Sequence, residues 1–509
     1  MEGEIGGTAA KAEFDAAIIG GGPVGVTLAN MLGFYGLKVA VFEKEPSVYH
    51  MPRASHMDAE VMRIYQSFGL SEALNRIVIG AKGYEFLNGD GKVLLKLDKP
   101  EGDSPQGWKY HYRFYQPNFE QVLRAGTERF EQVRMFLEHE VTGIEEKHGY
   151  VQLRVDNRTK HESIEVSASY VIGCDGGRSM VRRSLGIEMD DVGLRQQWLV
   201  VDVKLKREVA LPPKGIQYCE PSRPITYVPM IGDYDRYRWE IMLLPGETKE
   251  EMERPEQVWG LLNRWLQPED ATLERASVYI FHSVIAKQWR KSRVFLAGDS
   301  AHQTPPFLGQ GLCAGVRDAA NLAWKLNMVV HGQAEESLLD TYQSERSPHV
   351  RQFIDMATEL GKIITVLDPE EAAARDRKLL SGDTRTLVQP APLLGSGIRL
   401  ADGELAGTLF AQPRLGSGQL MDDAVGNRFA VIAEPDVIDN VSEETKAVWS
   451  RLDAVVLTDH GDELKSIFQM HDTAAFMIRP DRYVFGKAAG AAELERLTAE
   501  LERKLHYVS

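Results

Sequence analysis

The chain has 509 residues, of which 43% are hydrophobic and 26% are charged, and its formal net charge is −15. This balance is that of a globular protein of about three domains, and the acidic charge argues against a nucleic-acid partner and against electrostatic attachment to anionic lipid. No apolar run approaches the roughly 20 residues needed to span a bilayer, so we expect no membrane partner.

The N-terminal segment and the cysteines indicate the expected subcellular location of the protein. The opening MEGEIGGTAAKAE lacks the basic and apolar segments of a secretory signal, so we expect a flexible leader over residues 1–13. Cys174, Cys219 and Cys313 are far apart and form no CxxC pair. They favour structural thiols in a reducing cytoplasm, and we expect no metal site.

Residues 14–44, FDAAIIGGGPVGVTLANMLGFYGLKVAVFEK, predict a strand, a helix and a second strand. Gly20, Gly22 and Gly25 form a GxGxxG turn, and Glu43 ends the second strand, an arrangement typical of a dinucleotide-binding unit. The glycines permit a tight turn, backbone approach to a pyrophosphate and close packing of helix on strand. The helix N-terminus can bind phosphates, and Glu43 can accept from ribose hydroxyls. A glycine-rich turn without a ligand is the alternative, and the pattern does not distinguish FAD from NAD.

Two further motifs each follow a buried strand. In YVIGCDGGRSMVRRSLG, residues 170–186, the strand runs into Asp175, and a helix then carries Arg182 and Arg183. A turn with a capped basic helix is an equally good interpretation of this segment. In RVFLAGDSAHQTPPFLGQGLCAGVRDAANLAWKL, residues 293–326, a loop after Asp299 leads into a helix with one apolar stripe. Backbone N–H groups at that helix N-terminus can stabilise negative charge on a ring.

The three motifs in this order resemble the single-component FAD-dependent aromatic hydroxylases, flavoprotein monooxygenases related to 4-hydroxybenzoate hydroxylase and phenol hydroxylase. The segments PPFLGQGLCAGVRDAANLAWKL and YQSERSPH, residues 342–349, are most similar to the 3-(3-hydroxyphenyl)propionate hydroxylases. The resemblance covers at least residues 14–360. It implies tightly but non-covalently bound FAD, NADH or NADPH as a transient co-substrate, and a flavin hydroperoxide that transfers one oxygen of O₂ to a small phenolic ring.

The resemblance also implies cofactor contacts. Glu43 would bind the adenosine ribose, Arg53 would lie near the phosphates, and Asp299 would bind the ribityl chain. Gln116 matches a glutamine that contacts the cofactor, and Asp175 matches an acid associated with both FAD and NAD(P)H. Arg63 is only a loose match to the usual flavin-side arginine. The full set of implied cofactor residues is Gly20, Gly22, Pro23, Gly25, Glu43, Lys44, Arg53, Gln116, Asp175, Gly298, Asp299, Pro306, Gly309, Gln310, Gly311 and Leu312.

Residues 190–285 predict a substrate layer of strands rich in aromatic and branched residues. The candidate substrate-binding residues are Tyr218, Tyr227, Trp239, Met242 and Pro305, with ordinary sheet core as the favoured alternative for any single sheet residue. The candidate catalytic residues are His302, Pro306, Tyr218 and Tyr227, although for His302 we favour a role in organising the loop. His282 is better interpreted as structural. Arg223, Arg236 and Arg238 form no clear carboxylate clamp.

The resemblance implies an α/β fold: a Rossmann-like FAD-binding domain, a mixed β-sheet substrate domain as in 4-hydroxybenzoate hydroxylase, and a C-terminal thioredoxin-like domain. The expected ranges are 14–80, 108–189 and 286–366 for the first, 81–107 and 190–285 for the second, a linker over 367–396, and 397–509 for the third. The third contains no cysteine, so its expected roles are packing, stability or homodimer contacts. Its segment RPDRY is better interpreted as a hairpin turn at Pro480 and Asp481 than as a recognition site.

Other functions stay open at this point. A tailoring oxygenase acting on a polyketide or polycyclic aromatic is one alternative. A flavin-dependent halogenase is another, although the WxWxIP segment of halogenases is absent. An FAD-dependent scaffold that recruits a partner is a non-enzymatic alternative. The absence of a second GxGxxG unit disfavours a separate nicotinamide domain, and the absence of a close cysteine pair disfavours a disulfide reductase.

Overall fold

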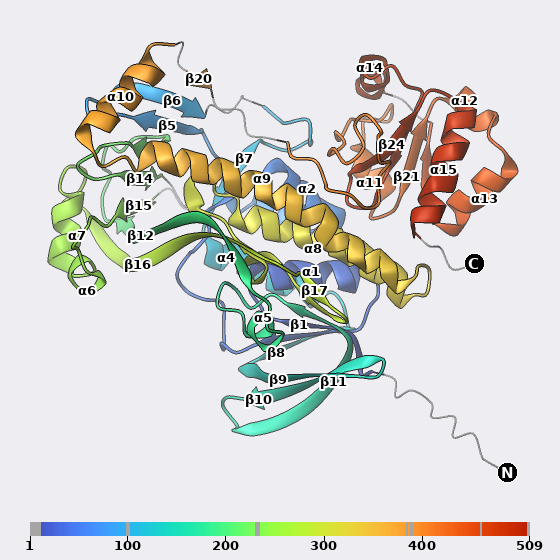
Figure 1. The fold of residues 1–509 in the computed structure, drawn as a ribbon, viewed down its shortest axis with the longest axis horizontal. Helices are drawn as coiled ribbons and strands as arrows, with labels where there is room; N and C mark the ends of the chain where they lie inside the picture. The colour runs from blue at the N-terminus through green and yellow to red at the C-terminus, as the bar shows by residue number, and fades with distance from the viewer. Residues whose placement is uncertain are drawn as a thin grey trace.

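A computed structural model describes residues 12–97, 102–229, 235–382, 385–386, 391–458 and 461–505. Most of the predicted leader therefore lies outside the described residues. Three sheet-containing layers follow one another, with the first sheet between the second and the C-terminal one (Figure 1). Among the described residues, no helix is long and apolar enough to cross a membrane.

The first sheet carries the GxGxxG turn. Its parallel core is β18 (Val294–Leu296), β11 (Glu162–Gly173), β1 (Phe14–Ile19), β2 (Val39–Glu43) and β8 (Val133–Leu137), in that order. The antiparallel strands β17 (Arg290–Lys291), β10 (Tyr150–Asn157) and β9 (His139–Lys147) extend it. Helix α1 (Pro23–Phe34) joins β1 to β2 and packs on α4 (Gln116–Thr127) and α8 (Gly311–Val330). Strand β1 is buried along most of its length because helices and neighbouring strands enclose it.

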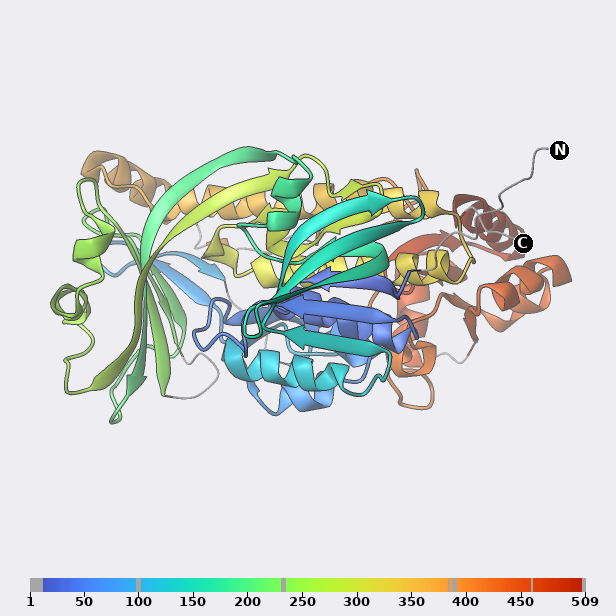
Figure 2. The same cartoon turned by 90° about the horizontal axis from the view of Figure 1, so that it is seen from below.

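The second sheet is built on two long strands, β12 (Met189–Leu205) and β16 (Ala271–Ala286), which arch between the layers (Figure 2). Its remaining strands are β15 (Arg236–Met242), β14 (Ile225–Val228), β13 (Gly215–Tyr218), β5 (Tyr84–Leu87), β6 (Val93–Leu97), β20 (Arg385–Thr386) and β19 (His302–Gln303). The short helices α6 (Lys249–Met252) and α7 (Pro255–Leu262) cover one face, and α9 (Thr341–Ile364) covers the other. Apolar residues line both faces, and the face that bears Trp198 and Met242 also carries a buried charged cluster of Asp202, Arg238, Glu240 and Arg275.

A small three-stranded sheet connects these layers. It contains β3 (His56–Asp58), β7 (His111–Phe114) and β4 (Val78–Gly80). The helices α2 (Ala59–Ser67) and α3 (Ser71–Asn75) lie between β3 and β4 in the chain. Helix α5 (Met180–Ser184) and the 3₁₀ turns η1 (Gly298–Ser300), η2 (Pro306–Leu308) and η3 (Glu336–Asp340) complete the connections.

The C-terminal sheet has the order β22 (Val455–Leu457), β21 (Ala430–Ala433), β23 (Ala475–Ile478), β24 (Val484–Ala488), with β21 and β22 parallel and the other pairs antiparallel. Helices α11 (Met421–Val425), α12 (Pro435–Asp439), α13 (Glu443–Arg451), α14 (Asp462–Met470) and α15 (Ala491–Leu505) accompany it. This is the thioredoxin-like arrangement. The predicted hairpin turn at Pro480 and Asp481 and the predicted helix over 491–505 are confirmed.

One part of the predicted linker is a helix. Helix α10 (Pro369–Leu380) begins after Asp368, whose carboxylate accepts hydrogen bonds from the backbone N–H groups of Glu370 and Glu371, each at 2.9 Å. A side-chain cap followed by proline and acids favours a helix start. The charged composition of this segment reflects one exposed helix face rather than an irregular connection.

Candidate functional site

The GxGxxG turn leaves one side open and the other tightly packed. A Cβ added to Gly20, which has φ +108°, would lie 2.4 Å from the Cys174 carbonyl oxygen, and one added to Gly25 would lie 2.1 Å from the Gly20 oxygen. A Cβ on Gly22 would meet nothing within 4 Å. Helix α1 begins here with Pro23, no side-chain cap and no acid in its first turn. Its N-terminus can therefore receive an anionic group at the open side of Gly22.

Glu43 and Arg124 flank this turn. Glu43 Oε2 accepts a hydrogen bond from the Gly21 N–H at 2.8 Å, and the side chain of Lys44 beside it is exposed. Arg124 Nη2 donates to the Gly21 carbonyl at 3.0 Å, while its Nε is buried without a partner among the described residues. No sequence signal identified Arg124, whose position beside the turn comes from the packing of α4 on α1.

Gln116 organises the segment that carries Arg53. Its Oε1 accepts from the backbone N–H groups of Arg53 and Ala54 at 2.7 and 2.6 Å, and its Nε2 donates to Glu120 Oε1 at 2.5 Å. The Arg53 side chain is exposed. Gln116 thus acts through the backbone of residues 53–54, and Arg53 is the group that can reach an anion.

Asp175 and Arg182 connect the second motif to the third. Asp175 Oδ2 accepts from the N–H groups of Met180 and Val181 at 2.6 and 3.1 Å, which caps α5, and Oδ1 is buried without a partner among the described residues. Arg182 donates to the carbonyls of Gly177 and Ser300 at 3.0 and 2.9 Å. Arg182 therefore holds the second and third motifs side by side through these two hydrogen bonds.

Asp299 is exposed between the buried residues Gly298 and Ser300. Its carboxylate has no hydrogen-bond partner in the described part of the chain. Surrounding protein raises the pKa of Asp299 despite this exposed surface, while Arg53 and His302 oppose the shift. A carboxylate in this position can accept from ligand hydroxyls such as those of a ribityl chain.

The segment from Pro305 to Leu312 lies at the start of α8. Pro305 is buried, Pro306 is partly exposed and begins η2, and Gly309 has φ +64°. Gln310 is buried and its Oε1 accepts from Arg317 Nη1 at 3.0 Å. Gly311 and Leu312 are partly exposed at the helix start, so backbone N–H groups there can reach a ligand ring.

His302, in β19 of the third motif, lies in the protein interior. Its ring is completely buried, its Nε2 is 2.6 Å from Asp318 Oδ2, and the Trp289 ring lies beside it, tilted by 35° with centroids 5.1 Å apart. The catalytic role considered for His302 is not supported, because the ring is buried and no part of it is exposed on the open side of the loop. Organisation of the loop is the role that fits.

The expectation that Tyr218, Tyr227 and Trp239 line a pocket is not supported either. All three lie on the face of the second sheet that packs on α6 and α7. The Tyr227 hydroxyl donates to the Pro212 carbonyl at 2.9 Å, and the Tyr218 hydroxyl accepts from Trp265 Nε1 at 3.2 Å. They are core residues of the outer layer.

Met242 lies on the opposite face, which approaches the third motif. There Phe307 of η2 packs with its ring centroid 5.6 Å from that of Trp198, and Trp198 stacks on Phe281 at 5.8 Å. Trp198 and Phe281 were not singled out in the sequence. This apolar face is the one that can hold an aromatic ring against the loop.

A cluster missed in the sequence adjoins the same loop. His56 Nδ1 donates to the Gly309 carbonyl at 3.1 Å, and His56 Nε2 is 2.6 Å from His111 Nδ1. Arg113 pairs with His56 across β3 and β7, so both side chains share a face. The Arg113 Nη atoms are buried without a hydrogen-bond partner among the described residues. Histidine, histidine and arginine therefore come together beside Gly309, although only Gly309 belongs to a recognised motif.

Other charged residues and cavities lie away from this site. Arg63, the loose match to the flavin-side arginine, pairs with Asp422 of the C-terminal domain at 2.6 and 2.8 Å.

A cavity of about 650 Å³ lies where α1 and α8 meet the C-terminal domain, and Trp324 and Phe429 are among its lining residues. Within the described residues, no group of three or more histidine, cysteine or acidic residues could hold a metal ion.

These residues together fit FAD: an open glycine turn at a helix N-terminus, an acid at the end of β2, an exposed arginine, and an unpartnered carboxylate at Asp299. A family profile described as FAD binding domain matches residues 13–357. A protein called probable NADH-specific resorcinol 4-hydroxylase from Rhodococcus jostii (strain RHA1) is 36% identical, over 97% of this chain and 95% of its own length. The chain belongs to the FAD-dependent aromatic hydroxylases.

A second relative and two solved structures match this chain over nearly its full length. A 3-(3-hydroxy-phenyl)propionate/3-hydroxycinnamic acid hydroxylase from Mycolicibacterium gilvum (strain PYR-GCK) is 32% identical, over 98% of this chain and 93% of its own. Among solved structures, the flavin-dependent monooxygenase PieE with FAD and substrate has a TM-score of 0.84 at 21% identity, covering 97% of this chain and 99% of its own. Aklavinone-11 hydroxylase with FAD and aklavinone has a TM-score of 0.82 at 22% identity, with the same coverage. The chain is an FAD-dependent monooxygenase with the fold of 4-hydroxybenzoate hydroxylase.

Proposed function

We propose that this hydroxylase acts on a small neutral phenol of the resorcinol type and takes its electrons from NADH. The observation that carries the proposal is the 36% identity, over nearly the full length of both chains, to a protein named an NADH-specific resorcinol 4-hydroxylase. The overall reaction converts the phenol, O₂, NADH and one proton into the ring-hydroxylated product, NAD⁺ and water. FAD, when bound, supplies the activated oxygen.

The apolar face of the second sheet supports a small aromatic substrate. Trp198, Phe281, Met242 and Phe307 offer ring and thioether surfaces beside the Gly309 loop, and burial of a ring there would exclude water. Apolar contacts alone fix the orientation of such a ring poorly, so polar groups at its edge must set that orientation.

We place the phenolic hydroxyl beside His56, His111 and Arg113. The carbonyl of Gly309 requires His56 Nδ1 to carry hydrogen, so in the neutral pair His56 Nε2 accepts from His111 Nδ1. This histidine pair can take up one proton, and the Arg113 guanidinium can stabilise a phenolate. An ionised phenol is the more nucleophilic form, so holding its proton on the pair favours oxygen transfer to the ring.

The experiment is a substrate panel on the purified yellow protein. Resorcinol should accelerate NADH oxidation and give a trihydroxybenzene, with NADPH much poorer than NADH. A preference for 3-(3-hydroxyphenyl)propionate would replace the substrate assignment, and hydroxylation only of polycyclic phenols would favour the tailoring alternative. Absence of hydroxylated product from every phenol would refute the proposal.

The variant His56→Asn tests the proton-holding role. It should lower kcat most below the pKa of the substrate hydroxyl and leave the FAD content unchanged. An unaltered pH profile would remove His56 from this role. We also propose a cytoplasmic location and a homodimer, which fractionation and light scattering test directly.

A further inference from the structure

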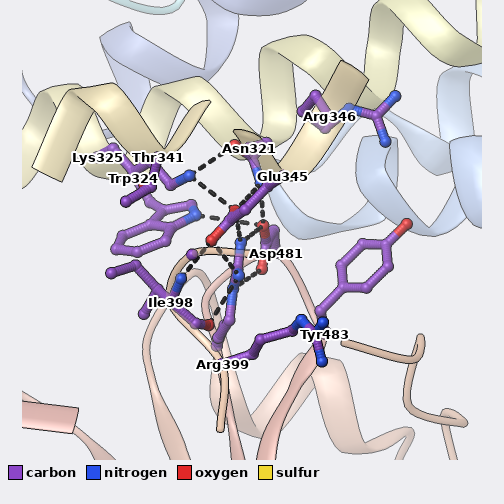
Figure 3. Close-up of polar contacts among 12 residues, drawn as sticks. Asn321, Trp324, Lys325, Thr341, Glu345, Arg346, Ile398, Arg399, Asp481 and Tyr483 are labelled. Carbon is purple, nitrogen blue, oxygen red and sulfur yellow. Dashed lines mark hydrogen bonds and ion pairs between the residues drawn. The ribbon is translucent and has the colours of Figure 1, made fainter. Parts of the chain in front are cut away.

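The turn between β23 and β24 inserts charged side chains between α8 and α9. Arg479 donates to Glu345 Oε1 and Oε2 at 2.9 and 2.8 Å and to Asp481 Oδ2 at 2.6 Å. Lys325 Nζ donates to Glu345 Oε2 at 2.7 Å. Two cations and two anions, all nearly or fully buried, thus balance one another at the domain interface (Figure 3). This cluster fixes the position of the turn relative to α8.

Tyr483 follows directly after this anchored turn, and its hydroxyl meets two side chains of the FAD-binding domain. It donates to Glu60 Oε1 at 2.8 Å and lies 3.3 Å from His349 Nε2. Burial raises the pKa of Tyr483 well above its ordinary value, so the hydroxyl keeps its proton and can donate it. One hydroxyl therefore connects two separate helices, α2 and α9.

The first connection runs from Glu60 to the start of α8. Arg317 donates to Glu60 Oε2 at 2.5 Å and to Gln310 Oε1 at 3.0 Å. Gln310 stands between Gly309 and Gly311, in the segment expected to line the flavin ring. Three hydrogen bonds thus link the Tyr483 hydroxyl to that segment.

The second connection runs from His349 to Gly298. Burial lowers the pKa of His349 well below its ordinary value, and Arg346 and Arg317 lower it further, so the ring is neutral. Arg346 Nη1 donates to His349 Nδ1 at 2.8 Å, which leaves hydrogen on Nε2, facing Tyr483. Arg346 Nε also donates to Asp318 Oδ1 at 2.9 Å.

Asp318 completes this connection. Its Oδ2 accepts from the Gly298 N–H at 3.1 Å and from His302 Nε2 at 2.6 Å. Gly298 directly precedes Asp299, the carboxylate expected to bind the ribityl chain. The donor directions agree along both connections, from Arg346 through His349 to Tyr483 and from Tyr483 to Glu60.

We propose that Tyr483 is a positioning residue of the flavin site: through its hydroxyl, the thioredoxin-like domain sets the conformation of the two segments around Gly298 and Gln310. This inference rests on the proposed flavin role of those segments. It gives the cysteine-free domain a task in the hydroxylase that neither thiol chemistry nor simple packing describes.

The test compares Tyr483→Phe with Tyr35→Phe. Tyr35 also bridges the two domains, because its hydroxyl donates to the Asn427 carbonyl at 3.2 Å, but it touches neither connection. In protein freed of FAD, hydrogen–deuterium exchange of peptides covering residues 298–312 should be at least threefold faster in Tyr483→Phe than in the wild type, and unchanged in Tyr35→Phe. Glu60→Gln, which weakens the bond to Arg317, should accelerate exchange over 309–312 more than over 298–300.

A spectroscopic measurement on FAD-loaded protein gives a second readout. Tyr483→Phe should shift the visible flavin absorption and weaken FAD binding several-fold, whereas Tyr35→Phe should do neither. Equal exchange and equal spectra in the two variants would overturn the proposal. Failure of the wild type to hydroxylate any phenol would refute the proposed function instead, and the exchange comparison on the FAD-free protein would still decide the role of Tyr483.

Discussion

Inside the protein, His302 Nε2 lies 2.6 Å from Asp318 Oδ2. The same carboxylate accepts from the Gly298 N–H and from Arg346, so it is the common acceptor of a histidine, an arginine and the backbone of the third motif. A histidine three residues after an acid, as His302 is after Asp299, invites an acid–base interpretation. Its burial instead makes His302 a support of the loop that carries Asp299.

His302→Ala should therefore act on stability before it acts on chemistry. Removing the imidazole leaves a buried Asp318 oxygen with one donor fewer and creates a cavity beside Trp289. We expect a loss of about 1–3 kcal/mol in the free energy of unfolding, measured by urea titration, together with weaker FAD retention. A variant with full stability and full FAD content but no turnover would restore the catalytic interpretation.

Asp299→Ala should weaken FAD binding. A hydrogen bond to a charged group is worth about 1.5–3 kcal/mol, which corresponds to a dissociation constant about 10–150 times larger. Flavin fluorescence titration of the apoprotein measures it. Asp436→Ala, at an exposed position of the C-terminal domain, is the matched control and should bind FAD as the wild type does.

The two faces of the second sheet should respond differently to substitution. Met242→Ala enlarges the face beside Phe307 and should raise the KM for the phenol or increase NADH consumption without product. Tyr227→Phe removes a hydrogen bond to Pro212 on the outer face and should lower stability by about 1 kcal/mol with KM unchanged. Steady-state kinetics and thermal unfolding separate the two outcomes, and a KM change in Tyr227→Phe would return that residue to the pocket.

Glu345 should make unfolding sensitive to acid. Burial raises its pKa, but Arg479 and Lys325 outweigh this effect and hold the pKa at about 2, below the ordinary value of 4.5. A carboxylate with a lowered pKa stabilises the fold fully above pH 4.5 and loses this contribution as the pH falls toward 2. Glu345→Gln should be less stable at pH 7 and should lose less stability between pH 4.5 and 2.5 than the wild type does.

The control for this acid titration is Glu359→Gln, an exposed residue of the same helix. It should follow the wild-type curve of unfolding free energy against pH. Parallel curves for Glu345→Gln and the wild type would show that Glu345 contributes nothing to the acid sensitivity.

What the sequence could predict depended on how local the signal was. The turn at Gly20, Gly22 and Gly25 and its flanking strands lie within 31 residues, so spacing alone defines the unit. Helix α10 could have been found as well, because Asp368, Pro369 and the two acids after them form a helix start. The charged composition of the segment masked that signal.

The orientation of the second sheet could not be predicted. Strand periodicity shows that Trp239 and Met242 of β15 point to opposite faces, but it does not say which face meets the flavin-side loop. The face of Met242 also carries Arg238 and Glu240, whereas the face of Trp239 is apolar, but this difference does not identify the face that meets the loop. The contact of Tyr483 with Glu60 spans 423 residues and leaves no trace in local pattern.

The pairing of Arg63 with Asp422 has a consequence for biosynthesis. The two residues are 359 positions apart, and both side chains are almost completely buried. While a ribosome extends the chain, the N-terminal unit that already contains the glycine turn carries an arginine whose carboxylate has not yet been made. The order of translation therefore delays the finished interface until the last fifth of the protein emerges.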